Sequence, residues 1–308
     1  MYDVLRYHLG WTGQRGVPAD NKTPLHFPAM LALVSCEAVC GDFRPALPAA
    51  AGVELVYNFT LVHGDVQAGR PETQDQPSIW RVWGPDQAIN AGDGLHALGR
   101  TTIMRLAQRG VPPDRVFQAV ESLDRACLTL CEGQYMDLDF QDRLTVTSAA
   151  YLDMIARKTG ALTGCSAESG ALAAGAGEAV CARFREMGGE MGMAWQVCRD
   201  VADLWGDDVT TSNALNKMKG LPLIHALENA TAAAKRELKS IYRKRALQPK
   251  DLSRVVDILD QADARRFAEN KAKELLDQAV QRLDSAGLPG EATDSLRRLG
   301  RWALEGCA

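Results

Sequence analysis

The chain has 308 residues, of which 46% are hydrophobic and 24% are charged, and its formal net charge is −4 at pH 7. This composition is that of an ordinary soluble globular protein, and the slightly acidic balance predicts neither a nucleic-acid partner nor attachment to anionic lipid. No apolar run approaches the ~20 residues of a membrane span, and the N-terminal "MYDVLRYHLGW" lacks the regions of a signal peptide, so we expect a cytoplasmic protein with no membrane span.

Helical periodicity runs along the whole chain. Apolar residues recur at steps of three and four in "PAMLALVSCEAVC" (28–40), "AINAGDGLHALGRTTIMRLA" (88–107) and "DRVFQAVESLDRACLTLCEG" (114–133). The same spacing continues in "SAAYLDMIARKTGALTG" (148–164) and "GMAWQVCRDVADLW" (192–205). No segment sustains the period-two alternation of a strand, and the pattern therefore predicts an all-α protein.

Breakers separate these helical segments. Pro and Gly occur together in "GVPPD" (110–114), "GLP" (220–222) and "SAGLPGEA" (285–292), where helices must stop. Residues 70–80 are polar, hold two prolines and are predicted to form a long loop. The chain beyond residue 229 is more charged, and its pattern predicts amphipathic helices that contribute less to the hydrophobic core. No internal repeat or linker is visible, so we predict a single all-α domain over residues 1–308.

Eight cysteines lie mostly inside the apolar helical pattern. In a reducing compartment they are expected to be buried thiols. The pairs "CEAVC" and "CLTLC" have i, i+4 spacing, which places each pair on one helix face. Zinc would need four converging ligands, and none of the five histidines stands at finger-like spacing from a cysteine pair. We therefore expect no zinc site.

The order of several motifs resembles that of the trans-polyprenyl diphosphate synthases of isoprenoid biosynthesis. The motifs are "RYHLGW", "LVSCEAVCGD", "LVYNFTLVHGD", "WRVWGPDQAINAGD", "RKTGALTG", "WQVCRDVADLWGDD" and "MKGLPLIHAL". The resemblance covers roughly residues 5–230, and "QAINAGD" and "KTGAL" are its most specific parts. It implies the all-α isoprenoid synthase bundle around a central cavity, which is usually a homodimer.

The resemblance also implies magnesium, but this chain departs from the family at the metal positions. In the family two aspartate-rich motifs hold three Mg²⁺ ions that bind the allylic diphosphate and stabilise its departure as an anion. The first and last acids of the first motif are here Gly64 and Ala68, and the leading acid of the second is Arg199. We therefore expect no bound metal and no other cofactor.

Three acids of these motifs remain at the expected cavity mouth, namely Asp65, Asp200 and Asp203. Arg199 could pair with Asp65 or Asp203, or it could take the place of magnesium against a phosphate. We favour the ion pair, because three neighbouring acids without a metal would otherwise repel one another.

The site that the resemblance implies for the second diphosphate is altered as well. Relatives hold this polyanion with a Gly-Gly-Lys-x-x-Arg-Pro element, since fixed cations are needed there. This chain reads "NKTPLHFP", with Phe27 ahead of Pro28 and Lys22 out of register. The paired arginines and the upstream histidine of the family fall on Thr73, Gln74 and Tyr57. These losses fall on diphosphate and metal ligands, while the apolar scaffold between them is kept.

Other positions of the resemblance are retained, although no catalytic residue can be assigned. Candidates for binding the diphosphate are Lys158, Thr159, Gln196, Lys217, Lys219 and Arg199. Lys158 could instead be a solvated helix residue, and Gln196 a buried amide that bonds to backbone. Candidates for lining the pocket are Phe59, Thr60, Gln67, Gln87 and Trp195. Phe59 stands where relatives block chain growth, and plain core packing is the alternative.

Two functions compete on this basis. The first is a catalytically silent partner or regulatory subunit, or a prenyl-diphosphate binder, either as a homodimer or as a heteromer with an active prenyl diphosphate synthase. The second is an atypical enzyme, a prenyltransferase or terpene cyclase that acts on an isoprenoid substrate without the usual magnesium cluster. The missing metal ligands favour the first, and the retained Lys158, Gln196 and aspartates keep the second open.

Overall fold

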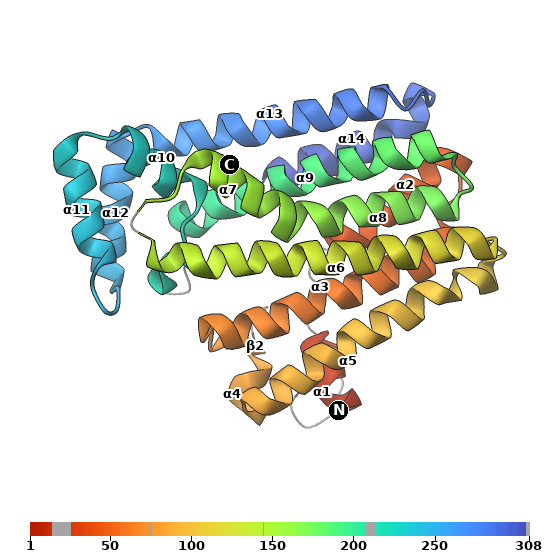
Figure 1. The fold of residues 1–308 in the computed structure, drawn as a ribbon, viewed down its shortest axis with the longest axis horizontal. Helices are drawn as coiled ribbons and strands as arrows, with labels where there is room; N and C mark the ends of the chain where they lie inside the picture. Colours follow the sequence, from red (N-terminus) through yellow and green to blue (C-terminus); the bar gives the residue numbers. More distant parts are fainter. Residues whose placement is uncertain (14–25, 74–75, 144, 207–212, 306–308) are drawn as a thin grey trace. The chain divides into compact units, whose positions relative to one another are not determined.

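The structure is a computed structural model that describes residues 1–13, 26–73, 76–143, 145–206 and 213–305 (Figure 1). Helices make up nearly all of its secondary structure, which confirms the all-α prediction. Within these ranges no helix is both long and apolar enough to cross a membrane. Lys22, Gln74 and Cys307 lie outside the described residues.

The chain divides into two compact units. Unit 1 comprises Met1–Leu123 and Ser169–Gly177, and unit 2 comprises Asp124–Glu168 and Glu178–Ala308. The boundaries fall inside α6 (Pro113–Asp142) and α8 (Ala161–Ala173), so both helices contribute to both units. A single domain over residues 1–308 stays a prediction.

Unit 1 is organised around a pair of helices, α3 and α5. Its elements in chain order are α1 (Tyr2–His8), α2 (Phe27–Cys40), η1 (Arg44–Ala46), α3 (Leu47–Ala68), β1 (Glu72–Thr73), β2 (Gln76–Pro77), α4 (Ile79–Trp83), α5 (Pro85–Ile103) and η2 (Met104–Arg109). A Cβ added to Gly52 would lie 2.9 Å from the carbonyl oxygen of Gly99, and one added to Gly99 would lie 2.8 Å from that of Gly52. These two glycines therefore allow α3 and α5 to pack backbone against backbone.

The segment predicted as a long loop contains a short hairpin. β1 pairs antiparallel with β2, and α4 follows directly. Hydrogen bonds attach the hairpin to α1. The Tyr7 hydroxyl donates to the carbonyl of Pro77 at 2.7 Å, and Gln76 Nε2 donates to the carbonyls of Tyr7 and His8 at 2.9 and 3.3 Å. These long-range hydrogen bonds cannot be read from local sequence, which explains why the loop prediction missed the hairpin.

Unit 2 is built around α9 and α13, which lie side by side (Figure 1). Besides its part of α6 and α8, its elements are α7 (Ser148–Ile155), the π-helical turn η3 (Ala156–Gly160), α9 (Glu178–Trp205), η5 (Asn213–Asn216), α10 (Leu221–Asn229), α11 (Ala232–Tyr242), α12 (Pro249–Gln261), α13 (Ala264–Asp284) and α14 (Gly290–Glu305). Two of these helices, α7 and α11, begin at threonine caps. Thr147 and Thr231 accept from the backbone N–H groups of Ala150 and Ala234, at 3.1 and 3.2 Å.

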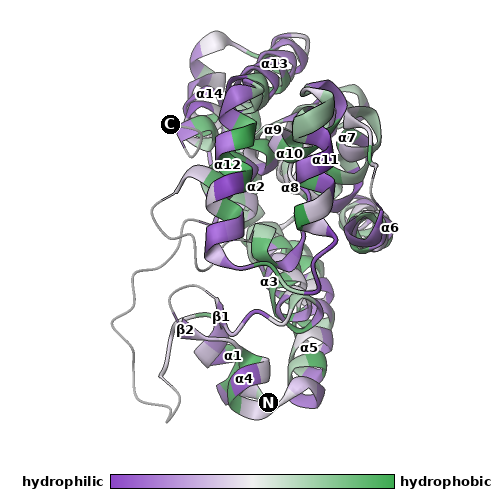
Figure 2. Ribbon diagram, turned by 90° about the vertical axis from the view of Figure 1, so that its left-hand side faces the viewer, coloured by the Kyte–Doolittle hydropathy of each residue, from purple (hydrophilic) through white to green (hydrophobic). Residues whose placement is uncertain are grey.

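The charged helices beyond residue 229 bury their apolar faces in a cluster that they share with the end of α9 and with α10, as their amphipathic pattern predicts. Leu223 of α10, Leu238 of α11 and Val255 and Leu259 of α12 are buried in one cluster. Hydrophilic and hydrophobic residues both occur along α11 and α12 (Figure 2), as expected for helices that bury one face.

The cysteines only partly follow the prediction of buried thiols. The two i, i+4 pairs remain thiols. In the first pair the Cys36 and Cys40 sulfurs lie 4.0 Å apart, and both donate to the carbonyl of Asp42 at 3.2 Å. Cys198 is disulfide-bonded, so the thiol prediction is wrong at that position.

Candidate functional site

The acid retained in the first motif is buried near the end of α3. Asp65 is only 2% exposed, and Nη1 of Arg70 lies 3.5 Å from its Oδ1. The carbonyl of Arg70 accepts from Ser78 Oγ at 2.8 Å and from Trp80 Nε1 at 2.6 Å. The segment that follows α3 therefore supplies both the counter-ion of Asp65 and the contacts that hold this counter-ion in place.

The surroundings of Asp65 disfavour its charge. Burial raises the pKa of this carboxyl from 3.8 to about 7, and the Arg70 charge and a hydrogen bond with Thr73 oppose the rise. A carboxyl with this pKa is partly protonated at neutral pH, whereas a metal-binding carboxylate must be ionised. The first motif thus retains one buried acid that already has an arginine partner.

The pocket-lining candidates of unit 1 are divided between core and surface. Phe59 packs against a hydrophobic cluster of this unit, and its ring centroid lies 4.9 Å from that of His63. Thr60 Oγ1 donates to a carbonyl of its own helix at 2.7 Å. Gln67 and Gln87 are exposed on α3 and α5. These contacts support core packing for Phe59.

Retained residues of unit 2 form a hydrogen-bonded chain. Thr159 Oγ1 donates to Oε1 of Gln196 at 3.1 Å, and Nε2 of Gln196 donates to Oδ1 of Asp200 at 2.9 Å. The other oxygen of Asp200 accepts from the Tyr151 hydroxyl and, at 2.9 Å, from the backbone N–H of Leu221. The Asp200 carboxylate of α9 therefore contacts α7 and α10 directly, and Gln196 connects it with η3.

The Asp200 carboxylate is largely engaged by these contacts. Burial raises its pKa from 3.8 to about 6, while the donors Tyr151, Leu221 and Gln196 oppose the rise. The Leu221 contact fixes the start of α10. Asp200 thus has a structural task that does not require a metal ion. Gln196 bridges two side chains and does not make the backbone bonds of the alternative considered from the sequence.

Lys158 is paired rather than freely solvated. Its Nζ lies 2.5 Å from Oδ2 of Asp137 on α6, and the two side chains are 23% and 5% exposed. The pair forms where α6 passes very close to η3, because a Cβ added to Gly133 would lie 2.4 Å from the backbone nitrogen of Lys158. A ligand that binds Lys158 must therefore share it with a buried carboxylate.

Arg199 is exposed on α9 and lies over an aromatic ring. Its guanidinium carbon is 5.0 Å from the ring centroid of Trp195, a cation–π arrangement. The third retained acid, Asp203, accepts from the backbone N–H of Ala214 at 3.3 Å. An ion pair of Arg199 with Asp65 or Asp203 stays a prediction.

The two lysines ahead of "GLP" have different environments. Lys219 is buried, and its Nζ donates to the carbonyl of Phe140 and, at 2.8 Å, to that of Gln141 at the end of α6. Burial lowers the pKa of Lys219 from 10.5 to about 8. Lys217 has a positive φ of 61° and lines a pocket with Lys219.

The residues at the motif positions do not fit a magnesium cluster. Magnesium takes hard oxygen ligands, whereas Gly64 and Ala68 have no side-chain donor and Arg199 brings a positive charge. In the part of the chain that the structure describes, no three His, Cys, Asp or Glu side chains form a group that could hold a metal ion.

Sequence reasoning missed several partners of the candidate residues. Asp137 and Tyr151 make contacts with Lys158 and Asp200 in unit 2, but neither belongs to a recognisable motif. Asp137 lies in "QYMDLDF", where an acid beside another acid on a helix suggests a solvent-exposed position. A cation pair with i, i+4 spacing, Lys239 and Arg243, was also overlooked, and it lines the pocket with Lys217.

A family model described as "Polyprenyl synthetase" matches residues 27–259. The chain is 36% identical over 286 residues to a geranylgeranyl diphosphate synthase of Mycobacterium tuberculosis, covering 91% of this chain and 80% of that protein. It is 31% identical over 287 residues to a geranylgeranyl diphosphate synthase of Methanosarcina mazei, covering 92% and 83%.

The solved structures agree with these relatives. A polyprenyl synthetase from Streptomyces coelicolor A3(2) is similar with a TM-score of 0.89 at 28% identity, covering 98% of this chain and 91% of the other. A geranylgeranyl pyrophosphate synthetase from Pyrococcus horikoshii gives a TM-score of 0.82 at 30% identity, covering 91% and 85%. The helical arrangement is therefore that of the isoprenoid synthases.

Proposed function

The chain belongs to the polyprenyl synthetase family, and we propose that it is a catalytically silent partner or regulatory subunit in isoprenoid biosynthesis that binds a prenyl diphosphate. The observation that carries this proposal is Arg199, which stands at the leading position of the second motif with its guanidinium over Trp195. A cation at this position repels the divalent ions that would neutralise a leaving diphosphate. The buried, arginine-paired Asp65 supports the same proposal from the first motif.

The proposed partner is a second copy of this chain or an active prenyl diphosphate synthase. Large apolar side chains are exposed along α6, where Phe117, Leu128 and Tyr135 are 73%, 66% and 75% exposed. Exposed apolar side chains on one helix support an interface with another protein surface. A synthase of the same family would present matching helices.

The second candidate is an atypical enzyme, a prenyltransferase or terpene cyclase that works without the usual magnesium cluster. The hydrogen-bonded chain through Thr159, Gln196 and Asp200 favours it, because a polar arrangement is retained where relatives bind the allylic diphosphate. The relatives named geranylgeranyl diphosphate synthase also make ordinary synthase activity the competing outcome to test.

A product assay separates these functions. The purified chain, an active synthase from the same organism and their mixture are each incubated with farnesyl diphosphate, labelled isopentenyl diphosphate and Mg²⁺. We expect no product from the chain alone, co-elution of the two proteins, and a changed rate or chain length in the mixture. Steady turnover by the chain alone contradicts the silent-partner proposal. A mixture that neither co-elutes nor changes its products rules out the synthase as the partner and leaves a second copy of this chain.

A further inference from the structure

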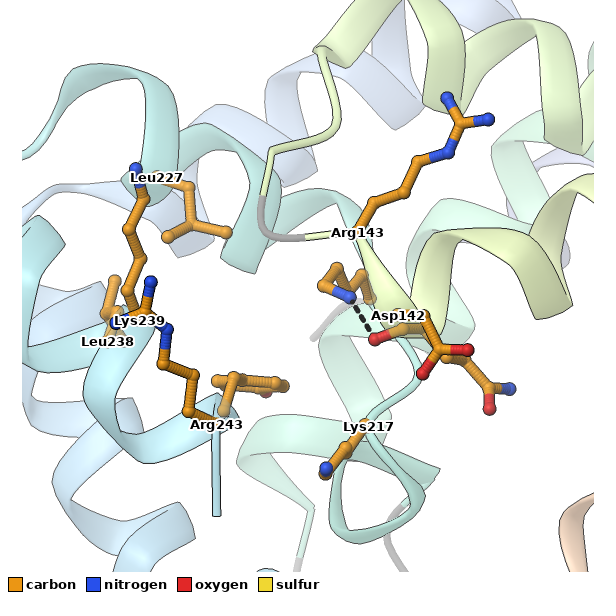
Figure 3. A pocket seen from close by; sticks show the side chains of 10 residues that line it. Asp142, Arg143, Lys217, Leu227, Leu238, Lys239 and Arg243 are labelled. Atoms are coloured by element: carbon orange, nitrogen blue, oxygen red, sulfur yellow. Dashed lines mark hydrogen bonds between the residues drawn. The ribbon is translucent and has the colours of Figure 1, made fainter. Parts of the chain in front are cut away.

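Unit 2 contains a pocket of about 190 Å³ beside the C-terminal end of α6. Its walls come from the end of α6, the turn at residues 217–219, α10, α11 and the residue after α11 (Figure 3). This volume is below the ~300–1,000 Å³ of pockets that enclose drug-sized ligands. The pocket is therefore the size of a small headgroup.

The lining of this pocket is strongly basic. It contains five basic side chains and one acid, namely Arg143, Lys217, Lys219, Lys239, Arg243 and Asp142. Lys239 and Arg243 stand at i, i+4 along the chain, and Figure 3 shows them across the pocket from Lys217. Like charges converging on a small space are unfavourable unless an anion compensates them. The composition therefore points to an anionic ligand.

Three of these cations are available to a ligand. Within the described ranges, Lys217, Lys239 and Arg243 make no side-chain hydrogen bond or ion pair. Arg143 differs, because its Nη2 pairs with Asp139 at 2.6 Å. The binding charges are thus supplied by the 217–219 turn on one side and by α11 and its C-terminal end on the other.

Tyr242 belongs to the wall of this pocket and makes no contact with a ligand. The residue is buried in the hydrophobic cluster of unit 2, and its hydroxyl oxygen has almost no accessible surface. Burial and the nearby Asp203 carboxyl both raise the pKa of this hydroxyl, so it stays neutral.

Lys219 is a positioning residue in this pocket. Its Nζ binds the carbonyls of Phe140 and Gln141, which are the negative end of α6. Without this ammonium group, the exposed carbonyls would repel an anion. Lys219 therefore makes the end of the helix compatible with a negatively charged ligand.

We propose that this pocket binds a diphosphate group without a metal ion, through Lys217, Lys239 and Arg243. Charge-assisted hydrogen bonds of this kind are the strong ones, so protein cations take the place that divalent ions would otherwise have. The ligand is the headgroup of a prenyl diphosphate or free diphosphate. The choice of diphosphate rests on the proposed function, whereas the anion site rests on the pocket alone.

Calorimetric titration of the full chain with inorganic diphosphate in excess EDTA tests the site. We expect binding by the wild type and a weakening of at least about tenfold in each of Lys239→Ala and Arg243→Ala, because each removes a charge-assisted contact. Arg236→Ala is the matched control, since it removes one positive charge from an exposed position of α11. Absence of binding by the wild type, or equal weakening by Arg236→Ala, overturns the proposal.

Parallel titrations with farnesyl diphosphate and farnesol identify the source of the headgroup. Farnesyl diphosphate binding that weakens in Lys239→Ala supports a prenyl headgroup, and binding of inorganic diphosphate alone supports free diphosphate. If farnesyl diphosphate binds unchanged in both alanine variants while inorganic diphosphate does not bind, the pocket proposal fails. The proposed function then survives, because its prenyl ligand would bind elsewhere.

Discussion

The guanidinium of Arg199 lies over the indole ring of Trp195, 5.0 Å from its centroid and one turn along α9. This stacking orients a cation at the position where the family resemblance places the leading metal ligand. We therefore expect no rise in the thermal midpoint with Mg²⁺ and farnesyl diphosphate beyond that with farnesyl diphosphate in EDTA, since only ligands that prefer the native state stabilise it. A reproducible magnesium-dependent rise contradicts this prediction.

Replacing the three metal positions by aspartate should create a magnesium site. A Cβ on Gly64 has its nearest neighbour, Nη2 of Arg70, at 3.8 Å, so an aspartate fits there. We expect Gly64→Asp, Ala68→Asp and Arg199→Asp together to give a magnesium-dependent thermal shift but little condensation, because the basic element for the second diphosphate is missing.

The corresponding triple asparagine variant is the control for this change, since it has similar size without the carboxylate charge. It should show no magnesium-dependent shift. Full synthase turnover in the aspartate variant would mean that the second diphosphate is held by residues other than those of the family element.

Lys158→Ala should destabilise the fold, because it leaves the buried Asp137 carboxylate without its cation. We expect a loss of about 2–4 kcal/mol in the free energy of unfolding, since breaking a buried pair costs about 3–5 kcal/mol and Lys158 keeps some contact with water. Urea unfolding of this variant, of Asp137→Asn and of the double variant measures the coupling. A double variant no more stable than Lys158→Ala would rule out the pair as the cause.

The raised pKa of Asp65 predicts a specific dependence of stability on pH. Because its folded pKa of about 7 exceeds its ordinary 3.8, the folded state binds more protons than the unfolded state between these values. The stability that the protonated Asp65 carboxyl provides to the folded state is therefore lost as pH rises toward 7. Asp65→Asn should gain stability relative to wild type between pH 5 and pH 8, by on the order of 2–3 kcal/mol.

Urea unfolding at the two pH values checks this prediction. Glu72→Gln, which changes an exposed acid on the neighbouring hairpin, is the control and should leave the pH dependence unchanged. If the difference between Asp65→Asn and wild type is the same at both values, Asp65 does not titrate as described.

Polar substitution on α6 should dissociate the proposed dimer. Phe117→Glu or Leu128→Glu places a charge on an exposed apolar residue, and an obligate interface of about 2,000 Å² or more does not tolerate it at its centre. Sedimentation velocity at micromolar concentration is the measurement, with Phe43→Glu as an exposed apolar control outside α6. Leu98→Glu is a poorer test, because Leu98 packs against the unit 1 core.

A wild-type chain that sediments as a monomer, and that binds no synthase of its organism, would contradict the partner-subunit function. The atypical enzyme would then be the leading candidate.

The sequence predicts the fold well because helical periodicity and breakers act locally. The prediction that Gly64, Ala68 and Arg199 stand at metal positions also comes from the sequence alone, through the motifs of the family resemblance. What it cannot provide are contacts between segments far apart in the chain. Asp137 lies 21 residues from Lys158, and Tyr151 lies 49 residues from Asp200.

The pocket beside α6 illustrates the same limit. Its cations come from position 143, positions 217–219 and positions 239–243, and each alone resembles a solvated lysine or arginine. The hairpin after α3 was missed for a similar reason, since its hydrogen bonds reach back to Tyr7. Convergence of distant side chains depends on packing, and single-residue patterns do not encode it.

The π-helical turn Ala156–Gly160 affects which changes a lineage of such proteins can accumulate. Loss of one residue there would restore an ordinary helix and rotate every following position by about 100° relative to α7. Lys158 could then not face α6 while Thr159 faces α9. Point substitutions should accumulate in this segment far more readily than insertions or deletions, so its length would be inherited even where its chemistry is lost.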